Sequence, residues 1–188
     1  MKHYLFVDGA SLLGRLKNIA AKFFGGAEFE IDFAKLVGSH TKMFFYDAVP
    51  VQKDDQNDAE YAALIAPKLA VLEKARSVDR IHVFEGDARK RKKAGHEQKM
   101  VDVAIAVDML THAFRKNMDE TTLLTGDVDF VPLVNALVQH GMMMTLWYPP
   151  DETSQKLVDA ADIRRCPSSD HLAQIGSQIS GVSASSWG

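Results

Sequence analysis

The chain has 188 residues, of which 46% are apolar and 25% charged, and its formal net charge is −3. This length suits one ordinary domain, and the composition excludes a collagen-like, coiled-coil or wholly disordered protein. The small negative charge gives no overall attraction to nucleic acid, so such binding must depend on a local basic surface. Cys166 is the single cysteine, no apolar run approaches the length of a membrane span, and the N-terminus enters a β-type run at once. We therefore expect a cytoplasmic protein without disulfides.

The first half of the chain alternates short apolar runs with helical patterns. Short runs typical of strands occupy residues 4–7, 43–46 and 81–84. The run at 4–7 is continuously apolar, as expected for a strand buried on both faces. Apolar residues recur with helical spacing over residues 10–23, 33–37 and 59–76. Pro67 should kink or divide the last of these helices, because it removes a donor and clashes with the preceding turn.

The second half continues the alternation. Residues 98–116 are apolar on most sides, which predicts a buried helix. The patterns that follow predict a strand ending at Leu124, a helix over 130–141, a strand over 142–148 and a short helix over 154–161. Beyond residue 166 the composition turns to Ser, Gly, Gln and Ala, so we expect a domain over 1–166 and a tail over 167–188 with a weak helix and a frayed end. Five strands alternating with helices predict an α/β fold with a mostly parallel sheet.

Acidic residues stand where predicted strands end. Asp8 follows the first strand, Asp47 the second and Asp127 the fourth. Ligands gather at the carboxyl ends of parallel strands, and if strands one and four are neighbours, Asp8 and Asp127 flank a topological switch point. Asp102 opens the helix before the fourth strand. Asp108 lies about 240° around that helix from Asp102, so it is the weaker candidate.

Carboxylates crowded at such a point repel one another unless a cation relieves them. Oxygen donors without a Cys or a His pair suit Mg²⁺ or Mn²⁺, and such a site supports phosphoryl transfer or phosphodiester hydrolysis. In the alternative interpretation the acids only cap helices and turns, with Asp129 as the N-cap of a helix starting at Phe130. An aspartyl-phosphate enzyme of the haloacid-dehalogenase type ranks last, because position 10, where its second acid is usual, is Ala10.

Three stretches resemble the signature blocks of NYN domains, in the LabA-like (DUF88) branch of the PIN-like nucleases. They are Phe6–Leu12, Lys99–Leu110 and Leu124–Phe130, and the resemblance extends over roughly Met1 to Ile163. It implies a three-layer α/β/α PIN-like (Rossmann-like) fold with a five-stranded sheet in the order 3-2-1-4-5, which makes strands one and four neighbours.

The resemblance also implies ribonuclease activity and a divalent-metal site. Its catalytic residues and metal ligands would be Asp8, Asp102 and Asp127, with Asp129 as a further ligand. Ser11 stands where the family commonly has Asn, and it is predicted with Thr125 to orient the substrate.

A basic run just before the helix of Asp102 consists of Arg89, Lys90, Arg91, Lys92 and Lys93. We interpret it as a surface that holds an RNA backbone by phosphate contacts, with a solvated loop as the alternative. Lys99, about one turn before Asp102, would contact phosphate or pair with an acid. The sequence thus predicts a Mg²⁺- or Mn²⁺-dependent ribonuclease, with a non-catalytic RNA- or nucleotide-binding module as the alternative. It predicts no membrane partner and leaves the oligomeric state open, a homodimer included.

Overall fold

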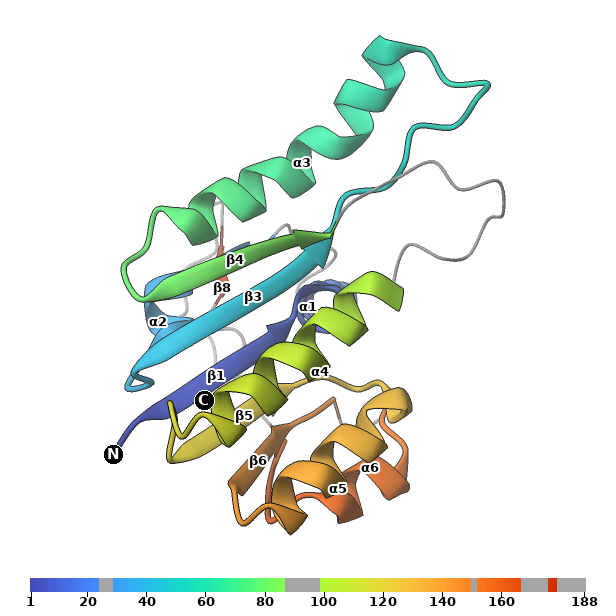
Figure 1. Cartoon of the computed structure of the whole chain (residues 1–188). Coiled ribbons are helices and arrows are strands. Elements are labelled where there is room, and N and C mark those ends of the chain that lie inside the picture. The colour runs from blue at the N-terminus through green and yellow to red at the C-terminus, as the bar shows by residue number, and fades with distance from the viewer. Residues whose placement is uncertain (24–28, 87–98, 150–151, 167–175, 179–188) are drawn as a thin grey trace, which may run out of the picture.

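The computed structural model describes residues 1–23, 29–86, 99–149, 152–166 and 176–178. A parallel sheet with the strand order β4-β3-β1-β5-β6-β7 runs through the centre of this part of the chain (Figure 1). Its strands are β1 (His3–Asp8), β3 (Lys42–Ala48), β4 (Ile81–Gly86), β5 (Glu120–Leu124), β6 (Met143–Trp147) and β7 (Ile163–Arg165). The five predicted strands therefore lie in the predicted order.

Helices cover the two faces of the sheet and confirm the three-layer α/β/α architecture. One face carries α4 (Lys99–Phe114), α5 (Val131–Gln139) and α6 (Gln155–Ala160), and the other carries α1 (Gly9–Phe23), α2 (Phe33–Val37) and α3 (Asp58–Arg76). Alternate residues of β1 enter different cores: Phe6 packs with α4 and α5, and Leu5 and Val7 pack with α1 and α2. This alternation is expected for a central strand buried on both faces.

The structure contains two short strand pairings that the sequence did not predict. β7 adds a sixth strand beside β6, and β2 (Phe29–Ile31) pairs antiparallel with β8 (Gly176–Gln178). The side chains of β7 are exposed, so this strand has no hydrophobic pattern from which to predict it. β8 lies within the segment for which the composition predicts a weak helix and a frayed end, and its three residues are a strand instead.

Pro67 does not divide α3, which the structure shows as one helix from Asp58 to Arg76. A capping box starts this helix: Asn57 accepts from the backbone of Glu60, and the Glu60 side chain accepts from the backbone of Asn57. Both reciprocal bonds satisfy donors that a helix start leaves free. None of the helices in the described ranges combines the length and the apolar character needed to cross a membrane.

The parallel register places the carboxyl-terminal ends of β1, β3 and β5 side by side at one end of the strands. Val7 lies between Phe45 of β3 and Leu124 of β5, and Asp8 pairs with Tyr46. In Figure 1 the arrowheads of β1, β3 and β4 meet near the start of α4. The acidic residues lie at this carboxyl-terminal end of the strands.

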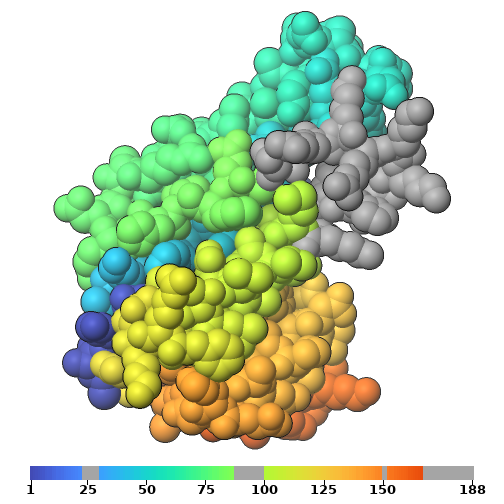
Figure 2. Space-filling view, in the orientation of Figure 1, coloured from blue at the N-terminus to red at the C-terminus, as the bar shows by residue number. Residues whose placement is uncertain are grey.

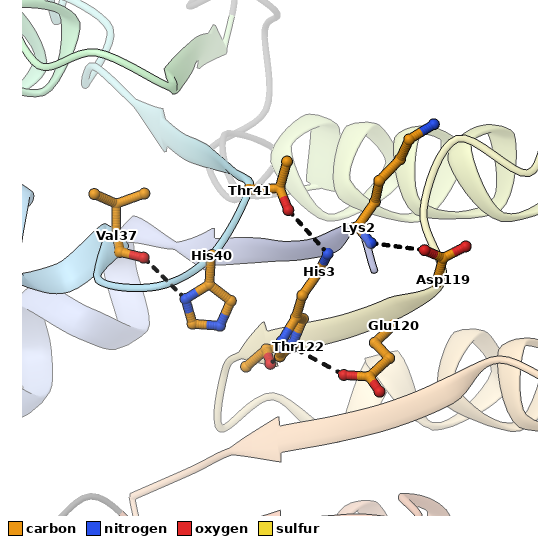
Figure 3. A network of polar contacts seen from close by, with 8 residues as sticks. All are labelled: Lys2, His3, Val37, His40, Thr41, Asp119, Glu120 and Thr122. Carbon is orange, nitrogen blue, oxygen red and sulfur yellow. Dashed lines mark hydrogen bonds and ion pairs between the residues drawn. The ribbon is translucent and has the colours of Figure 1, made fainter.

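A separate polar network lies near the amino-terminal ends of the strands (Figure 3). The backbone nitrogen of His3 donates to Thr41 Oγ1 (3.1 Å), and its ring lies 2.8 Å from Thr122 Oγ1 and 3.7 Å from a carboxylate oxygen of Glu120. The buried His40 donates from Nδ1 to the carbonyl of Val37 (3.0 Å). Burial lowers the pKa of His40 to about 4, so the folded protein keeps this ring neutral at neutral pH.

Candidate functional site

Asp8 is buried at the end of β1, and four hydrogen bonds hold its carboxylate. Oδ1 accepts from the backbone nitrogens of Ala10 (3.1 Å) and Ser11 (3.3 Å). Oδ2 accepts from the hydroxyls of Ser11 (2.6 Å) and Thr125 (3.0 Å). Asp8 therefore caps the first turn of α1 and at the same time remains at the strand end where a site is expected. Capping and site formation do not exclude each other here.

The hydroxyls of Ser11 and Thr125 connect the ends of β1 and β5. Ser11 Oγ accepts from the backbone nitrogen of Gly126 (3.3 Å), and Thr125 Oγ1 accepts from that of Asp127 (3.1 Å). Each hydroxyl thus donates to Asp8 and accepts from the turn after β5. A serine side chain is long enough for this double role.

Asp127, and not Asp129, caps the helical segment that follows. Its Oδ1 accepts from the backbone nitrogen of Asp129 (2.9 Å) at the start of the 3-10 turn η1 (Val128–Phe130), which leads directly into α5. The predicted cap at Asp129 is therefore wrong, because the helical turn begins two residues earlier than the apolar spacing indicates. Asp129 is exposed beside the partly exposed Asp127.

Asp102 links α4 to the same group of acids. It is half-buried in the first turn of α4, and its pKa is raised to about 6 by burial and by the charges of Asp8, Asp127 and Asp129. The acids from β1, α4 and the turn after β5 thus act on one another electrostatically. Asp108 instead accepts a hydrogen bond from Tyr46 (2.8 Å) on β3, and it is not among the charges that raise the pKa of Asp102.

The carboxylate oxygens of these acids are the kind of ligand that Mg²⁺ and Mn²⁺ prefer. A bound divalent cation would also relieve the repulsion between the carboxylates. Their present arrangement is not that of a formed metal centre. Within the described ranges, no three His, Cys, Asp or Glu side chains are grouped in a way that could hold a metal ion.

Asp47, the acid at the end of β3, has a different partner. It is 2% exposed, and its Oδ1 lies 2.9 Å from Nζ of Lys68 on α3. Burial raises the pKa of Asp47, and the ion pair with Lys68 opposes that rise. The charge of Asp8 also contributes to the raised pKa of Asp47. Asp47 therefore lies near the group of Asp8, Asp102, Asp127 and Asp129, but its ion pair with Lys68 ties α3 to the sheet.

Arg15 is a residue that the sequence analysis did not single out. Its Nε is buried without a hydrogen-bond partner, and the residue lines a small pocket of about 20 Å³ together with Ser11, Tyr148 and Pro149. The pocket lies between α1 and the end of β6, directly beside the hydroxyl that holds Asp8. Arg15 follows Ser11 by four residues, a spacing that places both on one face of a helix and could have pointed to it.

The predicted basic surface belongs to a segment outside the described part of the chain. Arg89, Lys90, Arg91, Lys92 and Lys93 lie outside the described residues, and the same holds for the side chain of Lys99, the first residue of α4. The site that can be described therefore consists of acids, two hydroxyls and Arg15.

Comparisons with known proteins agree with this fold. The family model described as NYN domain matches residues 2–167, and no curated protein matches the chain. A solved structure, "a protein of unknown function VPA0982 from Vibrio parahaemolyticus RIMD 2210633", superposes with a TM-score of 0.58 at 18% identity. The superposition covers 87% of this chain and 90% of that chain, and at this identity it shows likeness of fold alone. The match over nearly the whole described chain shows that this protein belongs to the NYN domain family of the PIN-like nuclease superfamily.

Proposed function

We propose that this protein is a divalent-metal-dependent ribonuclease that hydrolyses RNA phosphodiester bonds. The observation that carries the proposal is the convergence of Asp8, Asp102 and Asp127 at the carboxyl ends of β1 and β5, where the pKa of Asp102 is raised by its neighbours. Acids that repel one another in a folded protein cost stability, and a functional site is the usual reason for such a cost.

Each residue has a role in this proposal. Asp8, Asp102 and Asp127 would hold Mg²⁺ or Mn²⁺, with Asp129 as a further ligand. When bound, the cation would activate a water molecule and neutralise charge on the phosphate. Ser11 and Thr125 keep the Asp8 carboxylate in place by donating to its Oδ2, and they connect it to the turn that carries Asp127.

Single-stranded RNA is the proposed substrate, and the basic run of residues 89–93 with Lys99 would hold its backbone. Contacts of this kind bind phosphate without regard to base sequence. Arg15 adds a cation beside the acids within the described part of the chain, where it could contact the phosphate next to the one that is cleaved.

A second function is favoured by one observation. Because no three described ligands are grouped to hold a metal ion, the domain could bind RNA or a nucleotide without cutting it. The two functions differ in a direct assay. Cleavage of single-stranded RNA by the pure protein should require Mg²⁺ or Mn²⁺ and stop with EDTA, whereas a binding module should retain RNA intact under all these conditions.

Asp127→Asn tests the assignment of the site. The variant should lose about 100-fold or more of the cleavage rate, because a charged ligand is removed, whereas Asp159→Asn on the exposed side of α6 should keep its activity. Without metal the variant should melt no earlier than the native protein, since one repelling charge is gone and the Asn oxygen can still accept from Asp129.

Added Mn²⁺ should then raise the melting temperature of the native protein and of Asp159→Asn, and that of Asp127→Asn much less, because only folded protein with a complete site binds the ion. Equal shifts in all three proteins would remove Asp127 from the metal site.

A further inference from the structure

β3 and β4 present ring side chains on the face of the sheet that carries α4. The ring of Phe44 on β3 stacks on that of His82 on β4, with 5.1 Å between the ring centres and 23° between the planes. On its other side, the ring of Phe44 lies 4.9 Å from that of His112 on α4. Further along the two strands, the rings of Tyr46 and Phe84 lie 5.7 Å apart. We call these five residues the aromatic face.

The aromatic face is only partly covered by the rest of the described chain. His82 is exposed, and Phe44, Phe84 and His112 are half-buried. In Figure 1, α4 crosses in front of β1 and β5 and leaves most of β4 uncovered. In Figure 2, atoms of β3 are visible between those of β4 and those of α4. A surface of accessible rings is one on which a flat ligand can stack.

Two cations lie beside these rings. Burial lowers the pKa of His82, and the charge of Lys42 at the start of β3 lowers it further. Burial lowers the pKa of His112 as well, although the charge of Asp108 opposes this shift. Lys42 and Arg115 act on His112 in the same direction as burial. Both histidine rings are therefore neutral at neutral pH, and positive charge lies close to them.

The carboxylates of the surrounding elements have partners of their own. Asp108 accepts a hydrogen bond from the tyrosine hydroxyl of β3 (2.8 Å), and Glu85 on β4 pairs with Arg76 on α3 (2.7 Å). Asp119 and Glu120, which follow α4, contact the backbone and the histidine ring at the start of β1. These contacts neutralise part of the negative charge, and the two cations beside the rings then favour an anionic ligand.

Flat rings beside positive charge fit a ligand that has both flat groups and phosphates, and a single-stranded nucleic acid has both. We infer that the aromatic face binds single-stranded RNA, with bases stacked on Phe44 and His82 and phosphates held by Lys42 and Arg115. The choice of RNA rests on the proposed function, and the binding surface is additional to the acids and to the basic run.

The aromatic face continues towards the acids. Tyr46 and Phe84 follow Phe44 and His82 by two residues on their strands, and Tyr46 is the register partner of Asp8. Two residues of a strand span roughly 7 Å. RNA stacked on Phe44 is therefore within a few nucleotides of the position at which cleavage is proposed.

Binding of a short fluorescein-labelled single-stranded RNA of mixed sequence, measured by fluorescence anisotropy in EDTA, tests the stacking. His82→Ala should raise the dissociation constant about fivefold or more, because one stacking ring is removed. His82→Phe should bind like the native protein, since it restores a ring. The matched control is His140→Ala, at an exposed position just after α5. A native protein that does not bind this RNA, or a His82→Ala variant that binds as tightly as the control, would overturn the inference.

Lys42→Gln tests the phosphate contact. It should weaken binding and reduce the log–log slope of affinity against salt by about 0.7, the value for one phosphate of a single strand. Lys17→Gln, on an exposed residue of α1, should leave the slope unchanged. An RNA duplex of the same sequence should bind the native protein more weakly, because its bases already stack on one another. Equal binding of the duplex, or a native slope in Lys42→Gln, would contradict the inference.

Cleavage of the same RNA in Mn²⁺ separates this inference from the proposed function. A native protein that binds RNA through the aromatic face but does not cut it would support the inference and reject the nuclease. A native protein that cuts RNA, with His82→Ala binding and cutting equally well, would reject the inference and leave the nuclease intact.

Discussion

Arg15 has an unpaired buried Nε one helical turn from Ser11, and this placement leads to a prediction about RNA binding. Arg15→Gln should weaken the binding of single-stranded RNA by about tenfold, the effect of losing one charged contact to phosphate, and should change the cleavage rate of bound RNA less. The matched control is Lys17→Gln, an exposed residue on the same helix. Equal binding losses in the two variants, measured by fluorescence anisotropy, would show that only the general charge of α1 matters.

His40 makes the stability of the fold depend on pH. Its pKa is about 4 when folded and close to 6.5 when unfolded, so between these values the unfolded chain binds a proton that the folded protein excludes. The resulting stability is complete above pH 6.5 and is lost as the pH falls toward 4, at a rate of at most about 1.4 kcal/mol per pH unit.

His40→Asn, which can still donate to the carbonyl of Val37, should flatten this part of the stability profile. Urea unfolding at several pH values measures the slope. His140→Asn, at an exposed position, serves as the control, and a variant of His40 with the native slope would show that another group is responsible.

At the scale of single elements, the start of α1 depends on Gly9. A Cβ at this position would lie 2.7 Å from the backbone oxygen of Tyr46 and 3.0 Å from the Cβ of Asp47, so the helix and β3 approach too closely for any other residue. Gly9→Ala should therefore cost roughly 1–3 kcal/mol and displace Asp8 from its hydrogen bonds.

Gly14, in the middle of the same helix, has open space around its Cβ position. Gly14→Ala should therefore stabilise the protein by up to about 1 kcal/mol. Thermal unfolding of both variants separates a steric effect of Gly9 from the general helix propensity of glycine, because a purely intrinsic effect would have the same sign in both.

The elements also show how far the sequence predicts the structure. β1 and β3 contain continuous apolar runs, so their type and most of their burial follow directly from the residues. The sequence also predicts β4 as a strand, but it lies at the edge of the sheet, and its residues 81–85 are partly buried or exposed. β7 has exposed side chains and is held by backbone pairing with β6. The pattern of apolar side chains therefore could not predict this strand. The 3-10 turn before α5 is likewise set by a hydrogen bond from Asp129 to Asp127 and not by apolar spacing, which is why the predicted cap is two residues late.

The candidate site was predictable where residue type and strand position coincide. Asp8 and Asp127 follow apolar strands, and Asp102 opens the helix that precedes the fourth predicted strand. The double role of Ser11 and Thr125 depends on the distance between two strand ends, and the unpaired Nε of Arg15 depends on burial, so neither can be obtained from spacing alone.

At the scale of the whole molecule, the core residues that the structure describes all lie within residues 1–166. Deletion of residues 167–188 removes β8 and its three pairings with β2. We expect the shortened chain to fold and to lose about 1 kcal/mol, which lowers the melting temperature by about 2–4 °C. The Mn²⁺-dependent increase in melting temperature should remain. Insoluble or unfolded protein after this deletion would show that the tail completes the core.

The central position of β1 has a consequence for synthesis of the chain. This strand is synthesised before both of its neighbours in the sheet, β3 and β5, and β5 begins more than a hundred residues later in the chain. Thr125, which holds Asp8, is 117 residues away in sequence. Contacts between segments this distant form late, because a long loop of chain must close first. A nascent chain that ends before Thr125 therefore has Asp8 without its second hydroxyl and without Asp127, and the proposed nuclease site stays incomplete until this part of the chain has been synthesised.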